Sequence, residues 1–348
     1  MRRARRTNTF SGRSRGGRAA ARAFTFLVVL CLLLFAGGGV WLTRFAMSSV
    51  KVPDGSLYFN IERGLGVSQV ARRLEGEGLV TDARAFVILV RILGKSGHIK
   101  AGSYQAETNV TPLRLVDKLT RGEFAQGQIQ FIEGWTFRQL RAALDAHPAL
   151  THNTKDWSNV EILEQLGAGE THPEGLFFPD TYHFSAGTSD LIILRQAYDK
   201  MQTVLAQAWD TRASDLPVRT KYQGLILASI VEKETGEPTE REMVAAVFIN
   251  RLRKGMRLQT DPTVIYGLGE KFDGNLRKRD LLEDQPYNTY TRYGLPPTPI
   301  ALPGEAAIYA TLQPAETRAL YFVAKGDGTH YFSKSLKEHN RAVNRFQR

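Results

Sequence analysis

One stretch near the N-terminus limits what this chain can become more than any other. Ala23 to Leu42, AFTFLVVLCLLLFAGGGVWL, is 20 residues long and contains no charged side chain. As a helix it would extend about 30 Å, enough to cross the hydrocarbon core of a bilayer. A cleaved signal peptide would have a shorter apolar core, of about 7 to 15 residues, followed by a small-residue cleavage site. The length therefore favours an uncleaved transmembrane anchor, over residues 23–46, above a signal peptide.

The charges around this stretch predict its orientation. Residues 1–22 contain eight arginines and no acidic residue, so they account for most of the net charge of +11. Such a tail suits nucleic acid, anionic lipid or plain solvation, and the apolar stretch beside it favours the lipid. By the positive-inside rule the N-terminus lies in the cytoplasm. We therefore expect a single-pass protein of the inner, cytoplasmic membrane with no nucleic-acid partner, whose residues after about Met47 lie in the periplasm.

The remaining residues, about 300, are more than one core usually organises and suggest two units. Residues 52–126 form the smaller, with the pattern strand, two helices, short strand and helix. We expect these elements at Ser56–Ile61, Ser68–Leu74, Ala85–Ile92, Lys100 to Tyr104 and Pro112 to Gly122. This order resembles a LysM-like module, for which glycan contact and mere spacing are equally open roles. Cys31 is the single cysteine and lies in the apolar stretch, which excludes an intrachain disulfide.

Residues 127–348 form the larger unit, for which the pattern predicts a mixed α+β fold. A strand in IQFIEGW, helices, a hairpin around Asp327-Gly328 and a last helix, Leu336 to Phe346, follow one another. The segment EGLFFPDTYHF, residues 174–184, interleaves aromatic residues with proline and aspartate. We expect an extended, aromatic-lined loop that stacks on sugar rings, with ordinary core packing of Phe177, Phe178 and Tyr182 as the alternative.

A carboxylic acid stands out in the helix that contains VEKE. At about 100° per residue, Leu227, Ile230 and Val231 form one apolar stripe, and Glu234 continues it. Glu232 points about 200° away, so the two acids cannot share a pocket. A desolvated carboxyl has a raised pKa and can donate a proton near neutral pH, which makes Glu234 a candidate general acid. Gly236 and the following Pro238 support the alternative of a frayed, solvated helix end.

The next segment favours the buried position. Thr239 and Glu242 fit a capping box, which predicts a helix that runs to about Lys254. Its apolar stripe includes Ala246 and Val247, and Asn250 continues that stripe, so we expect Asn250 and Glu234 to face one cavity. The residues that follow show no helical period and are expected to form a polar wall, with Gln259, Thr260, Asp261 and Tyr266.

Three motifs then carry a resemblance to a known family. They are IVEKET (residues 230–235), VFINRLRKGMRLQTDPTVIYGLGE (247–270) and YNTYTRYGLPPTPI (287–300). Together they resemble the catalytic-domain motifs of the membrane-bound endolytic murein transglycosylases. The resemblance implies a membrane anchor, a LysM-like module, a mixed α+β catalytic domain and non-hydrolytic cleavage of peptidoglycan glycan strands. It also implies a role as terminase of glycan elongation, beside wall polymerases such as penicillin-binding proteins.

The same resemblance assigns residues. The family's catalytic acid is the second glutamate of its motif, here Glu234, which the helical period also selects. The family places the EG…PDT stretch close to its catalytic cleft and the YNTY loop near its substrate groove. Substrate-binding residues carried over on this basis are Glu174, Asp180, Tyr182, Asn288 and Tyr290.

The chemistry that these residues suggest needs one carboxyl. If the C6 hydroxyl of the muramyl residue attacks its own anomeric carbon, a 1,6-anhydro end forms without activated water. Glu234 then serves as acid and as base, while Asn250, Gln259 and Tyr290 orient the sugar. A hydrolysing muramidase needs a second carboxylate, for which Asp261 and Asp180 are most available. The other alternative is an anchored glycan-binding scaffold. Scattered histidines and the absence of HExxH, GxSxG and P-loop motifs predict no metal and no cofactor.

Overall fold

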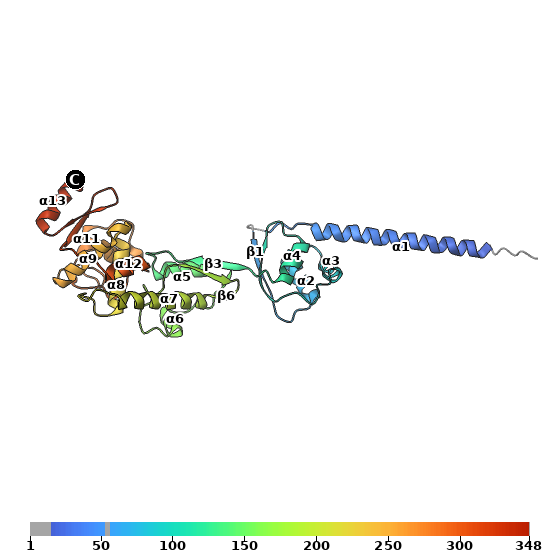
Figure 1. Ribbon diagram of the computed structural model, residues 1–348, viewed down its shortest axis with the longest axis horizontal. Helices are drawn as coiled ribbons and strands as arrows, with labels where there is room; N and C mark the ends of the chain where they lie inside the picture. Colours follow the sequence, from blue (N-terminus) through green and yellow to red (C-terminus); the bar gives the residue numbers. More distant parts are fainter. Residues whose placement is uncertain (1–14, 53–55, 348) are drawn as a thin grey trace, which may run out of the picture. The chain divides into compact units, whose positions relative to one another are not determined.

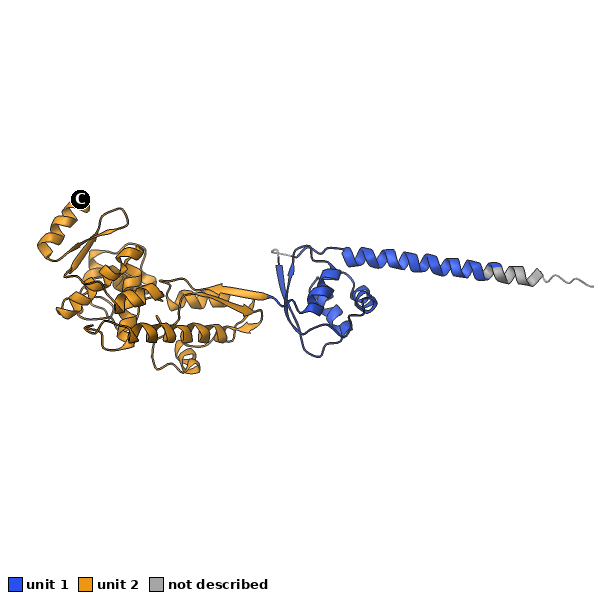
Figure 2. Ribbon diagram, viewed as in Figure 1, with its two compact units in different colours: residues 1–125 blue, residues 126–348 orange. Residues whose placement is uncertain are grey.

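The computed structural model describes residues 15–52 and 56–347. The chain folds into two compact units, Met1–Ala125 and Gln126–Arg348 (Figure 2). Helices and strands are mixed in both, which confirms the predicted α+β class (Figure 1). Most of the basic tail, residues 1–14, lies outside the described residues, so the prediction of its role is not addressed by the structure.

The first helix, α1 (Arg15–Met47), contains the uncharged stretch. Its segment Phe24–Met47 is long and apolar enough to cross a membrane, a test that a signal sequence also passes. The side chains between Phe24 and Val40 are exposed, whereas Phe45 and Ala46 are buried in the core of the first unit. The C-terminal turn of α1 is therefore part of a folded domain, while the segment between Phe24 and Val40 exposes its apolar side chains.

The first unit is built on a pair of antiparallel strands. Strand β1 (Ser56–Ile61) pairs with β2 (Gly102–Glu107), so that Ser56 lies opposite Glu107 and Ile61 opposite Gly102. Between the strands come helices α2 (Val67–Gly76) and α3 (Ala83–Ile92), and α4 (Pro112–Arg121) follows. The elements and their order agree with the prediction, while the LysM-like identity of the unit stays a prediction.

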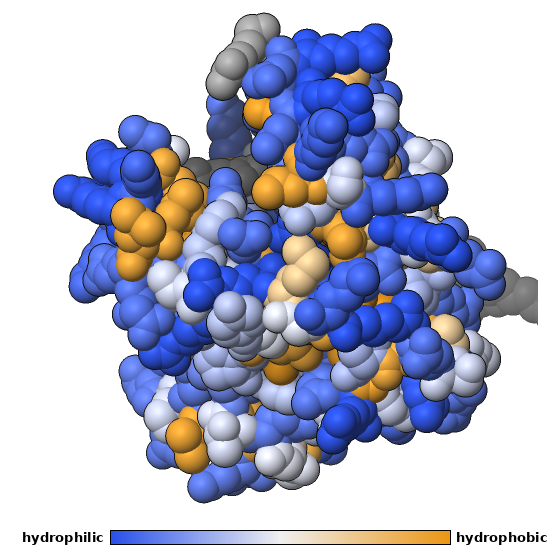
Figure 3. Space-filling model, turned by 90° about the vertical axis from the view of Figure 1, so that its left-hand side faces the viewer, coloured by the Kyte–Doolittle hydropathy of each residue, from blue (hydrophilic) through white to orange (hydrophobic). Residues whose placement is uncertain are grey.

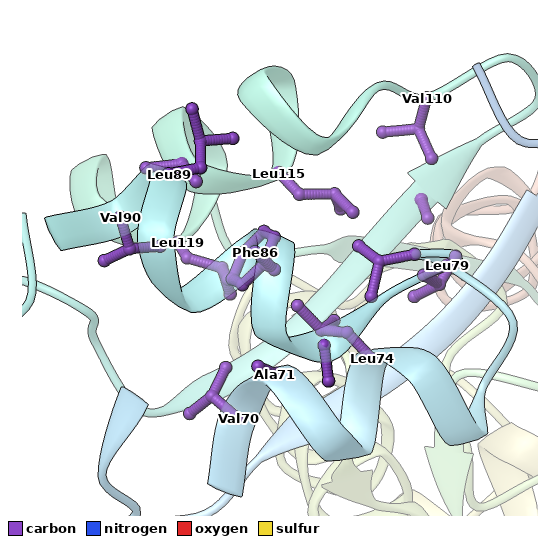
Figure 4. Packing of buried hydrophobic residues seen from close by; sticks show 14 of the residues in the cluster. Val70, Ala71, Leu74, Leu79, Phe86, Leu89, Val90, Val110, Leu115 and Leu119 are labelled. Atoms are coloured by element: carbon purple, nitrogen blue, oxygen red, sulfur yellow. The ribbon is translucent and has the colours of Figure 1, made fainter. Parts of the chain in front are cut away.

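Local signals and packing both define these helices. The Asp82 carboxylate accepts hydrogen bonds from the backbone N–H groups of Arg84 and Ala85 in the first turn of α3, and Thr111 caps α4. Gly122 ends α4 with a φ of 73°, a conformation that glycine adopts without strain. The apolar faces of the three helices meet in one core (Figure 4), which includes Val70, Leu74, Phe86, Val90, Leu115 and Leu119.

The second unit begins with short strands and helices. Strand β3 (Gln126–Gln130) pairs antiparallel with β5 (Thr181–Ser185), and β4 (Leu150–Thr151) pairs parallel with β6 (Thr188–Ser189). The helices of this region are α5 (Phe137–Ala146), α6 (Asn159–Leu166) and α7 (Asp190–Asp210).

The expected aromatic-lined loop at residues 174–184 is not formed. Part of this segment is strand β5, and its aromatic side chains are buried. Phe177 stacks on Phe137 with ring centroids 4.9 Å apart, and Tyr182 packs on Phe131 at 5.3 Å. Core packing was the correct alternative, because these rings are buried against other aromatic side chains of the unit rather than facing solvent.

Helix α8 (Lys221–Glu234) is the centre of the second unit. It packs against α7, α9 (Arg241–Arg253), α10 (Asp261–Leu268) and α12 (Glu305–Leu312). The chain closes with α11 (Lys278–Leu282), the hairpin of β7 (Tyr321–Ala324) and β8 (His330–Ser333), and α13 (Leu336–Phe346). All residues of α8 from Gly224 to Val231 are buried. Every face of the helix is therefore covered, and its apolar surface is not limited to one stripe.

Two local predictions in this region were wrong. Thr239 and Glu242 form no capping box, because the Glu237 carboxylate accepts from the Thr239 backbone N–H (3.2 Å) and hydroxyl (2.7 Å) and caps the 3-10 turn η2 (Pro238–Glu240) instead. The segment after Gly255 contains a helix, α10, which starts with Asp261 and a proline in its first turn. With eight residues, α10 is too short to show a helical period in the sequence; a second 3-10 turn, η3 (Gly269–Lys271), follows it.

Candidate functional site

A catalytic acid needs a cavity that admits the substrate, and Glu234 lines one of about 650 Å³. Three parts of the second unit enclose it. Helices α8 and α9 contribute Glu234, Phe248 and Arg251, the segment between α9 and α10 contributes Gln259, and Asp261 is the first residue of α10. The opposite wall consists of the β7–β8 hairpin and α13, with Tyr321, Phe322, Val323, Ala324, His330, Leu336, His339, Asn340, Val343 and Gln347, and Tyr290 completes the lining.

Glu234 is the last residue of α8 and is half-buried. Its Oε2 accepts a hydrogen bond of 2.7 Å from the Thr260 hydroxyl. Burial raises the pKa of Glu234, an effect that the hydrogen bond from Thr260 opposes and the neighbouring Asp261 carboxylate reinforces. The positive charge of Arg251 opposes it more weakly, as does His330 when it is protonated. The alternative of a frayed, solvated helix end is therefore wrong, and Glu234 has the environment of a proton donor.

Backbone geometry places the residues beside Glu234. Gln259 has a φ of 52°, a left-handed conformation that is uncommon for residues other than glycine and concentrates at functional sites. Its N–H donates to the Thr289 carbonyl (3.1 Å), and the N–H of the buried Thr260 donates to the Thr289 hydroxyl (3.1 Å). This pairing of two loops turns the Thr260 hydroxyl toward Glu234.

Asp261 and Tyr290 meet in the same cavity. The Tyr290 hydroxyl donates to Asp261 Oδ1 at 2.5 Å. Burial, followed by this hydrogen bond and the Asp261 charge, raises the pKa of Tyr290 above the range in which it could ionise. Asn288, by contrast, is fully buried, and its amide donates to the carbonyls of Asp280, Leu281 and Glu283. Asn288 therefore shapes the loop, and Tyr290 reaches the cavity.

Asn250 does not line this cavity. Its amide donates to the carbonyls of Thr317 (2.9 Å) and Ala319 (3.0 Å), in the segment that leads to the hairpin. The neighbouring Arg251 lines the cavity instead and donates to the carbonyls of Leu320 and Leu258. The expectation for Asn250 was wrong because α9 is buried from Val244 to Ile249, so an apolar stripe could not select one face.

The sequence argument missed His330, which lines the cavity, and Glu240, which contacts His330 from outside the lining. His330 begins β8, and its Nδ1 lies 2.7 Å from Oε2 of Glu240, at the end of η2. The His330 backbone N–H donates to both oxygens of the same carboxylate, at 2.9 and 3.1 Å. The two residues are 90 positions apart, and no local pattern pairs them. The available signal was a histidine at the start of an aromatic strand. It did not stand out, because the sequence contains seven histidines scattered along its length.

Glu174 and Tyr266 belong to a second, larger cavity, of about 1200 Å³. The buried Glu174 carboxylate accepts from the Phe137 N–H (2.8 Å) and from the Tyr266 hydroxyl (3.0 Å). Burial raises the pKa of Glu174 to about 7, although both hydrogen bonds oppose this. Helix α10 contributes Asp261 to the first cavity and Tyr266 to the second, so it divides the two.

The last two residues of the sequence-based set line neither of these cavities. Asp180 pairs with Lys200, which lowers the pKa of the aspartate. The Tyr182 hydroxyl donates to the Phe178 carbonyl at 2.7 Å, within the core. Both therefore have structural partners and stand apart from Glu234. Glu232, on α8, is half-buried rather than on the surface, and it accepts from the Gly304 N–H at 3.1 Å.

One group of side chains has the spacing of metal ligands. Single ligand atoms of Asp145, His152 and Asp190 lie within 4.8 Å of one another. The buried Asp190 carboxylate, however, accepts from the N–H groups of Asn153 and Thr154 and from the Thr154 hydroxyl. Its oxygens thus have the partners that explain its burial.

The end of the second unit that carries α13 has a mostly hydrophilic surface, with hydrophobic residues in small separate groups (Figure 3). A half-buried carboxyl with a raised pKa, in a cavity lined partly by α13 and the β7–β8 hairpin, defines the class of the protein: an acid–base enzyme for a polar substrate.

The chain belongs to the YceG-like family, whose model matches residues 59–345. A Bacillus subtilis protein named endolytic murein transglycosylase is 33% identical over 331 residues, which cover 90% of this chain and 91% of that protein. A Streptococcus pneumoniae protein of the same name is 26% identical over 361 residues, covering 92% and 65%. A crystal structure of a putative YceG-like protein from Listeria monocytogenes is 31% identical, with a TM-score of 0.54, and covers 82% of this chain and 98% of that one. The resemblance of the three motifs is thereby confirmed.

Proposed function

We propose that this protein cleaves nascent peptidoglycan glycan strands internally, at the bond between MurNAc and GlcNAc, and leaves 1,6-anhydro-muramyl ends. The family and its curated relatives make it an enzyme, a lytic transglycosylase that acts on peptidoglycan. The observation that supports the finer proposal is the environment of Glu234, a half-buried carboxyl with a raised pKa in the wall of a polar cavity.

The chemistry follows from one carboxyl. Protonated Glu234 gives its proton to the glycosidic oxygen as the bond from this oxygen to the anomeric carbon breaks. The carboxylate then takes the proton of the muramyl C6 hydroxyl as the C6 oxygen bonds to the anomeric carbon. No water is consumed, and Glu234 returns to its protonated form. Thr260 donates to the carboxylate formed midway, and thereby stabilises the state in which Glu234 acts as base.

A muramidase remains a second candidate, because Asp261 lines the same cavity as Glu234. A hydrolysing enzyme would need such a second carboxylate to attack the sugar or to activate water. The Tyr290 hydroxyl already occupies one oxygen of Asp261, which favours a role in orientation.

The proposal includes a location. Helix α1 would anchor the chain in the cytoplasmic membrane with its N-terminus inside, and the second unit would act on strands in the periplasm, beside the wall polymerases and penicillin-binding proteins. The apolar, exposed segment of α1 supports the anchor. Cleavage close to the membrane would limit the length of newly made strands, as expected for a terminase of elongation.

The test is product analysis with two matched variants. Wild type, Glu234→Gln and Glu232→Gln are incubated with purified, uncrosslinked glycan strands, and the products are weighed by mass spectrometry. Glu232 is the control, since it lies on the same helix and burial raises its pKa also, but its hydrogen bond goes to Gly304. We expect anhydro ends from wild type and Glu232→Gln and none from Glu234→Gln. Products heavier by one water would identify a muramidase, and no product from wild type would identify a scaffold.

A further inference from the structure

His330 lines the catalytic cavity, and its contact with Glu240 is the feature of this region that the proposed chemistry does not yet use. Both side chains are largely buried, with exposed fractions of 15% and 14%. The imidazole also meets the edge of Phe322, with ring centroids 5.4 Å apart. Three hydrogen bonds from one residue to a single carboxylate hold the ring in one orientation.

This geometry determines where the ring carries its proton. An ionised carboxylate can only accept hydrogen bonds, so Nδ1, which faces Glu240, is the protonated nitrogen. In the neutral ring Nε2 then bears a lone pair and acts as an acceptor. Among the residues that the structure describes, Nε2 has no hydrogen-bond partner.

The other charged groups around His330 are already engaged. Glu234 accepts from Thr260, and Asp261 accepts from Tyr290. The Arg251 guanidinium donates to backbone carbonyls. The second histidine of the wall, His339, stacks on Tyr321 with centroids 5.2 Å apart and has no carboxylate to fix its tautomer. His330 thus offers the cavity an oriented acceptor that the folded chain does not use.

We propose that His330 binds the glycan in the catalytic cavity by accepting a hydrogen bond at Nε2 from a sugar hydroxyl or acetamido N–H. Glu240 is the positioning residue, because it fixes the tautomer that leaves Nε2 free to accept. Glycan strands carry many such donors, and a buried acceptor discriminates strongly between partners that satisfy it and those that do not. The inference rests on the proposed function, since it names a contact of the same substrate.

Binding without turnover isolates this contact. In the Glu234→Gln background, the dissociation constant for purified glycan strands is measured at pH 8, where histidines are usually neutral, with and without His330→Ala. Loss of one hydrogen bond between neutral groups is expected to weaken binding by roughly fivefold to tenfold. His183→Ala, at an exposed position outside the cavity, is the matched control and should bind as the parent does.

A spectroscopic arm reports on the tautomer and keeps the test valid if His330→Ala folds poorly. In ¹⁵N-labelled protein, Nδ1 of His330 should carry the proton, and glycan should shift the Nε2 resonance. Glu240→Ala removes the acceptor that holds the ring proton on Nδ1, so the ring should also adopt the form protonated at Nε2, and glycan binding should weaken. Unchanged affinity in both variants, or an Nε2 resonance indifferent to glycan, would overturn the inference. Failure of the proposed function would look different: wild type would then release no anhydro ends.

Discussion

Replacement of Glu174 by glutamine should stabilise the second unit relative to wild type, and this gain in stability should be larger at alkaline pH than at acidic pH. The buried Glu174 has a pKa of about 7 in the folded chain, against 4.5 without its surroundings. Glutamine keeps an acceptor for the Phe137 N–H, and its NH₂ group can donate to the Tyr266 hydroxyl. The substitution therefore removes the ionisation and retains the packing.

The sign follows from proton linkage. Between pH 4.5 and 7 the folded state holds a proton on Glu174 that the unfolded state has released, so wild-type stability falls as the pH rises. Above pH 7 Glu174 is ionised in both states, and the folded state bears the full free-energy cost of a buried carboxylate. A shift of this size corresponds to about 3 kcal/mol, at 1.36 kcal/mol per pKa unit. Glu174→Gln lacks this loss, so its advantage should grow by about 3 kcal/mol from pH 4 to pH 8.

Urea unfolding of the full chain in detergent micelles measures this difference. Tryptophan fluorescence reports mainly on the second unit, which contains Trp135, Trp157 and Trp209. Glu164→Gln, at an exposed position of α6, is the control and should follow wild type at every pH. A stability difference between Glu174→Gln and wild type that stays constant from pH 4 to pH 8 would refute the reasoning, because it would mean that Glu174 titrates normally.

Three further substitutions separate residues that act in the catalytic cavity from one that only supports the fold. Thr260→Val removes the hydrogen-bond donor that favours ionised Glu234, so the pKa of Glu234 should rise further. The alkaline limb of the pH profile of kcat/KM should then move to higher pH. An alkaline limb at the same pH as in wild type would mean that this limb does not report the ionisation of Glu234. Tyr290→Phe frees an oxygen of Asp261 and should raise KM about threefold to tenfold in strand-cleavage kinetics, and an unchanged KM would remove Tyr290 from the substrate contacts. Asn250→Ala should lower the free energy of unfolding by about 1 to 3 kcal/mol and leave the cleavage products unchanged, because the Asn250 amide donates only to backbone carbonyls. Altered products from a variant of full stability would instead show that Asn250 contacts the substrate.

Several parts of the fold were predictable because their signals are local. The uncharged run from Ala23 to Leu42, the caps Asp82 and Thr111 and the stop at Gly122 each act within a few residues, and the structure contains the helices they predict. Signals of the same kind failed where a neighbour competed for the same group. Glu237, for example, engages the Thr239 hydroxyl and prevents the expected capping box.

The candidate site was predictable only at its centre. Motif and helical period both selected Glu234, and the structure places it in a cavity wall. The helical period could not predict the position of Asn250, because α9 is buried on nearly all sides. Tertiary contacts alone decide which of its polar residues faces the cavity. Glu174 was expected near Glu234, and the structure assigns it to a separate cavity on the far side of α10.

By itself the sequence determined an apolar helix that can span a bilayer, a mixed α+β chain in two units, and Glu234 as the acid to examine. The tertiary structure decided which groups surround that acid. Thr260 lies 26 positions from Glu234, and His330 lies 90 positions from Glu240. Contacts of this separation form when whole elements pack, since burial leaves polar groups that must find partners wherever the fold brings them. The pKa of Glu234, and with it the proposed chemistry, is therefore a property of the packed domain.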